Sequence, residues 1–178
     1  MSFTVEVAAD PAYVSGLATL AVDELRAKRD QCQELENALS YVRRLVHGRL
    51  DIVCNELELR TAGSESADLE AIIARLPALL AEGSRGSGLP RPPQDFAPGS
   101  IAEPLVEELE TIFPVSVMAS VPEITIDELG DLANSLTDHE QNVSDGRRQL
   151  HGVIDLLQGE MIRRYRSGDA SVDALLDS

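Results

Sequence analysis

Five polar residues of the chain are spaced so that an α-helix would place them on one face. They follow one another at intervals of four, three, four and four positions, which at about 100° per residue confines them to an arc of roughly 80°. Their side chains offer two carboxylates, a hydroxyl, a guanidinium and an imidazole, a set able to hold a charged ligand through directed hydrogen bonds. Taken alone, such a stripe is ordinarily solvated surface. The residues are Glu36, Ser40, Arg43, His47 and Asp51.

The same stripe occurs a second time, each residue 104 positions downstream of its counterpart. Chance rarely repeats five polar residues in register, so we interpret the two stripes as copies of one unit. The second stripe consists of Glu140, Ser144, Arg147, His151 and Asp155. Seven residues outside the stripes recur at the same offset. The first set is Asp23, Glu24, Leu25, Arg44, Gly48, Glu56 and Arg60, and the second is Asp127, Glu128, Leu129, Arg148, Gly152, Glu160 and Arg164.

Two long helices are needed to position the stripes. In the first of them, successive apolar residues are mostly three, four or seven positions apart, which is a heptad pattern. We therefore expect this helix over 18–62. Only Gly48 interrupts it, at a cost of about 1 kcal/mol in a helix interior. We expect the second helix over 124–166, because Thr125 and Glu128 form a capping-box pattern at its start.

The heptad register places part of each stripe inside the interface between the helices. Glu36 and Arg43 fall at a positions, and so do Glu140 and Arg147. Charged layers therefore interrupt an apolar seam, and a purely structural interpretation is that Arg–Glu pairs fix the register of a coiled coil at a cost in stability. Fixing the register would not require the additional polar side chains, serine, histidine and aspartate, that lie beside these layers. The d positions of the first helix are Leu25, Cys32, Leu39, Val46 and Val53.

The rest of the chain divides around the two helices. Ala67 to Glu82 is expected to form a short amphipathic helix broken at Pro77, and Pro104 to Phe113 another short helix. A flexible Gly, Pro and Ser-rich linker separates them, and Pro114 to Glu123 is expected to be loop with weak strand character. The predicted divisions are a loosely ordered N-terminal arm at 1–17, the first long helix at 18–62, a linker with short helices at 63–123, the second long helix at 124–166 and an acidic tail at 167–178.

Composition excludes several functions. The 178 residues carry a net charge of −16, which argues against direct DNA binding, since phosphate contacts need clustered Lys and Arg. Aromatic residues make up only 3% of the chain, which favours helical seams over a large globular core. We expect a soluble, cytoplasmic protein, because no signal segment and no run of ~18 apolar residues is present. Cys32 and Cys54, ~33 Å apart on one helix, are too distant for a disulfide.

Antiparallel pairing of the helices would bring both stripes onto one face about a pseudo-two-fold axis. We therefore expect an all-α fold, with the two long helices forming an antiparallel coiled-coil hairpin. Arg43 and Arg147 can bind phosphate, or the O6 and N7 edge of guanine. The carboxylates can accept hydrogen bonds from guanine N1 and N2, whereas adenine carries an acceptor at N1. Symmetry and chemistry together point to a cyclic diguanylate.

At these residues the sequence resembles the RsiG anti-sigma factors of actinobacteria. Their pattern, Glu-x3-Ser-x2-Arg-x3-Gln-x3-Asp on each helix of an antiparallel hairpin, matches both stripes. The resemblance implies that two cyclic-di-GMP molecules bind as a dimer between the helices, and that the loaded protein sequesters a WhiG-type sporulation sigma factor from RNA polymerase. His47 and His151 depart from the pattern, with one ring donor where glutamine has two amide donors. Arg44 and Arg148 are additional candidates for ligand binding.

Other functions compete with this one. A metal site is conceivable because His and Asp stand at ligand-compatible spacing in both stripes, but the stripe arginines would repel a cation. An enzyme is disfavoured, since Ser40 and His47, seven residues apart on one helix, supply neither an adjacent base nor an oxyanion site. The main alternative is a structural coiled-coil adaptor without a small-molecule ligand. Without ligand, four carboxylates and two arginines are expected to meet in a poorly packed seam and to pair the helices weakly.

Overall fold

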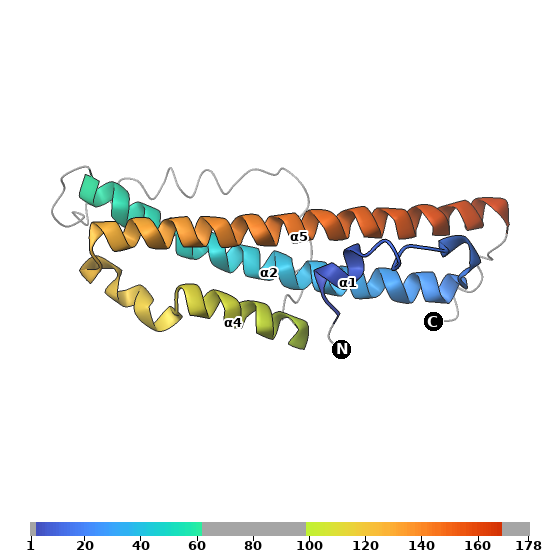
Figure 1. The fold of residues 1–178 in the computed structure, drawn as a ribbon, viewed down its shortest axis with the longest axis horizontal. Coiled ribbons are helices and arrows are strands. Elements are labelled where there is room, and N and C mark those ends of the chain that lie inside the picture. The colour runs from blue at the N-terminus through green and yellow to red at the C-terminus, as the bar shows by residue number, and fades with distance from the viewer. Residues whose placement is uncertain (1–2, 62–98, 169–178) are drawn as a thin grey trace, which may run out of the picture.

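The computed structural model describes residues 3–61 and 99–168, and the regular structure in these ranges is entirely helical. Two long helices dominate it, α2 over Val22–Thr61 and α5 over Ile126–Ser167 (Figure 1). The shorter elements are α1 over Val5–Ala9, α4 over Glu103–Ile112, and the 3₁₀ helices η1 over Leu17–Thr19, η2 over Ser100–Ala102 and η3 over Val115–Glu123. The predicted short helix over Ala67 to Glu82, the linker after it and the acidic tail from residue 169 lie outside the described residues.

The long helices α2 and α5 lie side by side and run in opposite directions (Figure 1). Near the start of α2, Arg26 donates to the hydroxyl of Tyr165 near the end of α5, at 2.6 Å. At the other end of α2, Arg60 donates to the backbone oxygen of Ile124, just before α5. The predicted d positions fill the contact between the helices, each at most 4% exposed: Leu25, Cys32, Leu39, Val46 and Val53. Each such apolar side chain stabilises the pair by roughly 1.5–3 kcal/mol.

The predicted capping box starts α5. The Thr125 hydroxyl accepts a hydrogen bond from the backbone nitrogen of Glu128, and the Glu128 carboxylate accepts one in return from the backbone nitrogen of Thr125 at 3.0 Å. These bonds satisfy donors that the first helical turn leaves without partners. At its other end α5 stops at Gly168, whose φ of 78° lies in the left-handed region that favours glycine.

The internal repeat extends beyond the stripes to the segments that lead into the long helices. A short helix and a 3₁₀ segment precede each of them, α1 and η1 before α2, and α4 and η3 before α5. Each leading segment contacts the long helix of the other copy. Helix α1 packs on α5, and α4 packs on α2 and also touches α5. The contact of α1 is close at Gly146, where an added Cβ would lie 3.3 Å from Val5. Each copy of the unit therefore helps to hold the other.

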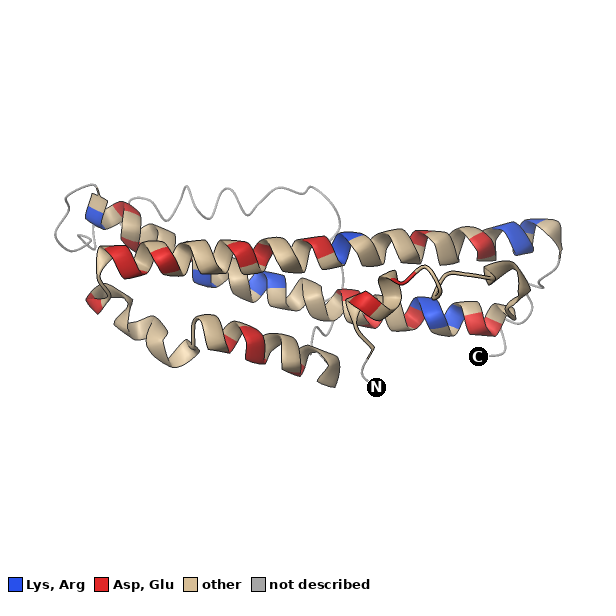
Figure 2. Ribbon diagram, in the orientation of Figure 1, with Lys and Arg blue, Asp and Glu red and all other residues tan. Residues whose placement is uncertain are grey.

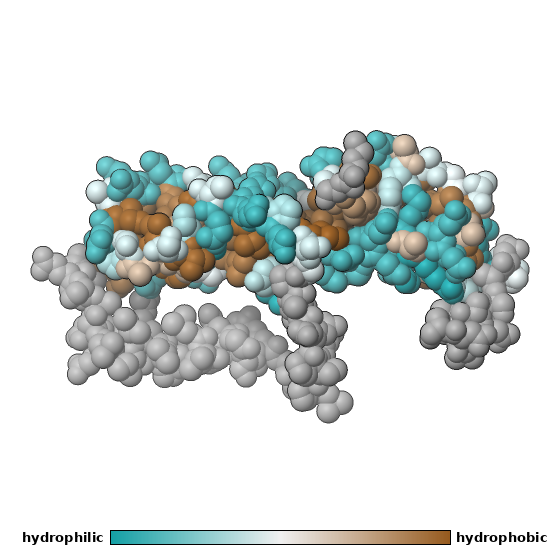
Figure 3. Space-filling view, turned by 90° about the horizontal axis from the view of Figure 1, so that it is seen from below, coloured by the Kyte–Doolittle hydropathy of each residue, from teal (hydrophilic) through white to brown (hydrophobic). Residues whose placement is uncertain are grey.

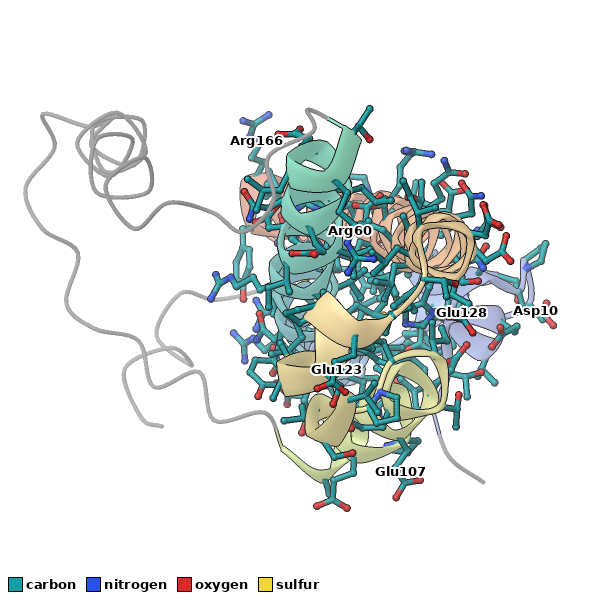
Figure 4. The ribbon with its side chains drawn as sticks, turned by 90° about the vertical axis from the view of Figure 1, so that its left-hand side faces the viewer. Asp10, Arg60, Glu107, Glu123, Glu128 and Arg166 are labelled. Atoms are coloured by element: carbon teal, nitrogen blue, oxygen red, sulfur yellow. The ribbon has the colours of Figure 1, made fainter. Side chains whose placement is uncertain are left out.

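Two equivalent arginines fasten the leading segments to the ends of the long helices. Arg60 of α2 and Arg164 of α5 donate to backbone oxygens of the segment that precedes the opposite long helix. A glutamate one turn earlier holds each guanidinium, Glu56 at 2.7 Å and Glu160 at 2.8 Å. Figure 4 shows Arg60 between α2 and the segment that carries Glu123. The accepting oxygens belong to Val121, Pro122 and Ile124 on one side and to Leu17 and Leu20 on the other.

The prediction for Pro114 to Glu123 is wrong. The segment expected to be loop with weak strand character is instead largely the 3₁₀ helix η3, with Val121 only 3% exposed. A strand needs a neighbouring strand to satisfy its backbone, and the described residues form none. The guanidinium of Arg60 takes up backbone oxygens at the end of the segment instead.

The prediction of a loosely ordered N-terminal arm is also wrong for the described part of it. Ala8 in α1 is completely buried. The hydroxyl of Tyr13 donates to the backbone oxygen of Lys28 at 3.2 Å, and the Lys28 ammonium lies 3.7 Å from the centre of the Tyr13 ring. The arm is ordered because it covers apolar surface of the long helices, and the cation–π contact adds to this packing.

Charge and hydropathy are unevenly spread over the surface. Helix α4 carries carboxylates and no basic residue (Figure 2). Seen from the side of α4, hydrophobic residues gather over the half of the molecule that α4 and η3 cover (Figure 3), where Val115 and Val117 are exposed. Within the described ranges, α2 and α5 are long enough to cross a membrane but too polar to do so.

Candidate ligand-binding site

The two stripes meet across the seam between α2 and α5 and form two clusters. In the first cluster, Oε1 of Glu140 accepts hydrogen bonds from Nε of Arg43 at 2.8 Å and from the hydroxyl of Ser144 at 2.7 Å. Nε2 of His47 lies 3.1 Å from the same oxygen, and Arg43 Nε also lies 2.9 Å from the Ser144 hydroxyl. One carboxylate oxygen thus gathers a guanidinium, a hydroxyl and an imidazole.

The second cluster repeats the first with the helices exchanged. Oε1 of Glu36 accepts hydrogen bonds from Nε and Nη2 of Arg147, at 3.0 and 2.9 Å, and from the hydroxyl of Ser40 at 2.8 Å. Nε2 of His151 lies 3.5 Å from that oxygen. The arrangement is pseudo-two-fold symmetric, since each glutamate takes its serine from its own helix and its arginine and histidine from the opposite one. Eight of the ten predicted residues are brought together in this way.

The glutamates lie deep in the clusters and the histidines lie at the rim. The side chains of Glu36 and Glu140 are 8% and 19% exposed, against 47% for His47 and 55% for His151. The Ser144 hydroxyl and, after it, the Arg43 guanidinium lower the pKa of Glu140 from 4.5 to about 2, although partial burial opposes this. Glu140 is therefore anionic at neutral pH, and a ligand approaching from solvent would meet the imidazoles first.

Asp51 and Asp155 stand apart from the clusters. Each lies about one helical turn, ~6 Å, beyond the histidine of its own stripe, and in antiparallel helices these displacements point in opposite directions. Both aspartates are exposed, and neither makes a hydrogen bond or an ion pair with the rest of the described chain. The expected group of four carboxylates is therefore two inner glutamates flanked by two outer aspartates.

Arg44 and Arg148, the additional candidates, follow the stripe arginines by one position and are exposed. One residue of helix turns a side chain by about 100°, so they point away from the seam. Arg148 pairs with Asp145 of its own helix at 2.7 Å.

The expectation of a poorly packed seam is wrong, whereas weak helix pairing without ligand stays a prediction. It assumed that the four carboxylates would face one another, but Glu36 and Glu140 are each paired with an arginine of the opposite helix. The charges in each layer therefore neutralise one another, and Leu39 and Val143 beside them are at most 5% exposed.

Sequence reasoning did not find two polar residues that shape the site and its support. The side-chain amide of Gln33 lies 3.3 Å from Oε2 of Glu36, one turn away on the same helix. Arg49, only 4% exposed, donates to the backbone oxygen of Leu109 at 3.2 Å and to the carboxylate of Glu110, and so ties α4 to α2. Both escaped notice because the second copy has no equivalent. Helical spacing could have linked Gln33 with Glu36.

The clusters do not resemble a metal centre. Each glutamate oxygen is shared with a guanidinium, which repels a cation, and the described residues contain no group of three or more His, Cys, Asp or Glu side chains that could hold one. The arrangement is suited instead to a ligand that offers donors to the carboxylates and acceptors to the arginines.

Comparison with known proteins places the chain in a family. A family model described as RsiG-like matches residues 11–80 and 117–178, which include both stripes and most of the chain. No curated protein matches the sequence. The family suggests a regulator of the anti-sigma kind. On the strength of this match, and of the doubled motif whose geometry is given above, the chain belongs to the RsiG-like family.

Proposed function

We propose that the protein is an anti-sigma factor controlled by cyclic-di-GMP. Two molecules of the nucleotide bind as a dimer on the face shared by the two helices of an antiparallel coiled-coil hairpin, and the loaded protein sequesters a WhiG-type sigma factor from RNA polymerase, which represses sporulation genes. The crosswise pairing of Arg43 with Glu140 and of Arg147 with Glu36 carries this proposal. It supplies two equivalent sets of groups, as a two-fold symmetric ligand requires.

Guanine recognition requires each ion pair to exchange partners. Glu36 and Glu140 accept hydrogen bonds from N1 and N2 of a guanine, and Arg43 and Arg147 turn to phosphate or to the O6 and N7 edge. The released charges are not left buried and unpaired, because the ligand supplies a partner to both members of each pair. Four carboxylates, two glutamates and two aspartates, correspond to the four guanines of two ligand molecules.

Sigma capture follows from the acidic surface and from the ligand. Sigma factors contact DNA and polymerase partly through basic surfaces, which a chain of net charge −16 can cover. The ligand contacts both α2 and α5, and so fastens them together and changes the charge and shape of their shared face. The bound dimer thereby completes the surface that the sigma factor recognises, which couples the two binding events.

A structural adaptor without ligand is the second candidate, and one observation favours it. Both stripe glutamates have all their charge compensated inside the protein, as expected of Arg–Glu pairs that only fix helix register. An adaptor of this kind takes up no nucleotide, whereas the proposed regulator does. Direct binding experiments therefore separate the two functions.

Isothermal titration calorimetry of the full chain tests the ligand. We expect two cyclic-di-GMP molecules per chain, and no uptake by Arg43→Ala or Asp155→Ala. Arg166→Ala is the matched control, since it removes an exposed arginine at the far end of α5 and should leave binding unchanged. Failure of the unaltered protein to bind supports the adaptor, and equal binding of cyclic-di-AMP contradicts the guanine assignment.

A pull-down tests the partner. The immobilised chain should retain a purified WhiG-type sigma factor when cyclic-di-GMP is present and release it when the nucleotide is washed out. Arg43→Ala should retain none under either condition, while Arg166→Ala should behave as the unaltered chain. Capture that is equally strong without nucleotide would show that the ligand has no regulatory role.

A further inference from the structure

Each long helix contains a glycine at its interior that the fold does not explain. Gly48 in α2 and Gly152 in α5 occupy equivalent places in the two copies, and both helices continue through them. Glycine in the middle of a helix is unfavourable relative to alanine, because it has more conformational freedom to lose. Two such residues at matching positions need a reason.

Internal packing does not supply that reason. A Cβ added to Gly48 or to Gly152 would have no atom within 4 Å, so alanine fits at both positions. Gly146 shows the contrast, since its Cβ would lie 3.3 Å from Val5 and 3.5 Å from Leu39. Gly146 is required by the neighbouring element, whereas the two repeated glycines face open space.

The two glycines lie beside the outer end of each stripe, about 60° around the helix from its aspartate. On a helix, positions i, i+3, i+4 and i+7 form one contiguous patch. In α2 this patch is Arg44, His47, Gly48 and Asp51, and in α5 it is Arg148, His151, Gly152 and Asp155, all of them exposed. Each patch adjoins an inner cluster, because the histidine that belongs to it also reaches the glutamate of the opposite helix.

We infer that Gly48 and Gly152 form the floors of two base-binding sites, in which the flat face of a guanine lies against the helix backbone. This inference rests on the proposed function and extends it. A planar ring must approach to van der Waals distance over its whole face, and a side chain at the floor would hold it away from the backbone. Asp51 or Asp155 at the edge accepts hydrogen bonds from N1 and N2 of that guanine.

The inference divides the ligand dimer between two half-sites. One half-site consists of Glu140 on one helix with Arg43, His47, Gly48 and Asp51 on the other. Its glutamate takes an inner guanine and its aspartate an outer one, so that one cyclic-di-GMP molecule spans the half-site. This arrangement gives the aspartates, which have no partner among the described residues, a function equivalent to that of the glutamates.

Alanine substitutions test the inference, because stability and binding should change in opposite directions. Gly48→Ala and Gly152→Ala should each raise the thermal midpoint of the ligand-free chain and weaken cyclic-di-GMP binding by at least tenfold in calorimetry. Gly130→Ala is the matched control, since Gly130 also lies in α5 with no atom within 4 Å of an added Cβ, but is not repeated in α2. It should raise the midpoint and leave binding unchanged.

The outcomes separate this inference from the proposed function. If the unaltered chain binds cyclic-di-GMP and both glycine variants bind it equally well, the glycine inference fails and the function stands. If the variants bind the nucleotide normally but no longer capture the sigma factor, the glycines serve the protein partner and the base-binding assignment is wrong. A lowered midpoint would show a packing role instead. If the unaltered chain binds no nucleotide, both proposals fail together.

Discussion

Arg43 and Glu140 lie on opposite helices, 97 residues apart in the sequence, and are joined by an Nε–Oε1 hydrogen bond of 2.8 Å. Arg147 and Glu36 form the same bond in the reverse direction at 3.0 Å. Because each pair takes one member from each helix, the two pairs fix which turns of α2 face which turns of α5. Sliding one helix by a single turn, ~5.4 Å, would break both bonds.

The first prediction concerns the stability that these pairs provide. Glu36→Ala should lower the free energy of unfolding at neutral pH by about 2–3 kcal/mol, because it leaves the Arg147 guanidinium partly buried without its partner. Urea denaturation followed by circular dichroism measures the change. Asp145→Ala, which removes the exposed pair with Arg148, is the control and should cost less than about 0.5 kcal/mol. Equal losses in the two variants would argue against a role of Glu36 in fixing register.

The second prediction concerns acid stability. The pKa of Glu140 falls from 4.5 to about 2 on folding, so the unfolded chain holds this proton more tightly than the folded one. Ionised Glu140 therefore stabilises the fold above about pH 4.5, and this contribution is lost as the pH falls toward 2. Glu140→Gln should accordingly be less stable than the unaltered chain at pH 7, and the difference should shrink at pH 3. Urea midpoints at both pH values test this, and a difference that stays constant would contradict it.

The third prediction concerns the arginines that fasten the leading segments. Arg164→Ala should expose the η1 end of the arm, which hydrogen exchange would detect as faster exchange at residues 17–25, and should cost about 1–3 kcal/mol. The buried Arg164 donates to two backbone oxygens there, whereas the neighbouring Arg163 is exposed and pairs with the same Glu160. Arg163→Ala is therefore the control, and equally fast exchange in both variants would show that Arg164 does not hold the arm.

The long helices and their seam could be predicted because their signals are local. The heptad steps identify the buried positions, and Thr125 with Glu128 marks the start of α5 before any tertiary contact is known. The spacing also identified the polar residues that form the two clusters, while their role as a ligand site stays a prediction. Which glutamate meets which arginine depends on the antiparallel register, so the sequence pattern could not show that Glu36 pairs with Arg147 and Glu140 with Arg43.

The leading segments could not be predicted because their partners are distant in sequence. The oxygens of Leu17 and Val121 are held by Arg164 and Arg60, which the local sequence of either segment does not reveal. The repeat contained a usable signal, since Arg60 recurs as Arg164 outside the stripes. A recurring arginine with no place in the polar stripe indicates a repeated structural contact, here with the segment that leads into the opposite helix.

The fourth prediction concerns the position at which both stripes carry histidine instead of the glutamine of the family pattern. Glutamine offers two amide donors there, whereas a neutral imidazole offers one. On the proposed function, the variant His47→Gln with His151→Gln should still bind cyclic-di-GMP. Its affinity should equal or exceed that of the unaltered chain, as calorimetry of the two proteins would show.

The side chain at this position lies at the rim of a cluster, near the stripe glutamate of the opposite helix, as His47 and His151 do. His139→Gln is the control, since His139 is 5% exposed beneath α4 and its nearest carboxylate is that of Glu108, 3.7 Å away. This variant should bind the nucleotide as the unaltered chain does. If the double variant binds none, the rim histidines have a role in binding that glutamine cannot fill.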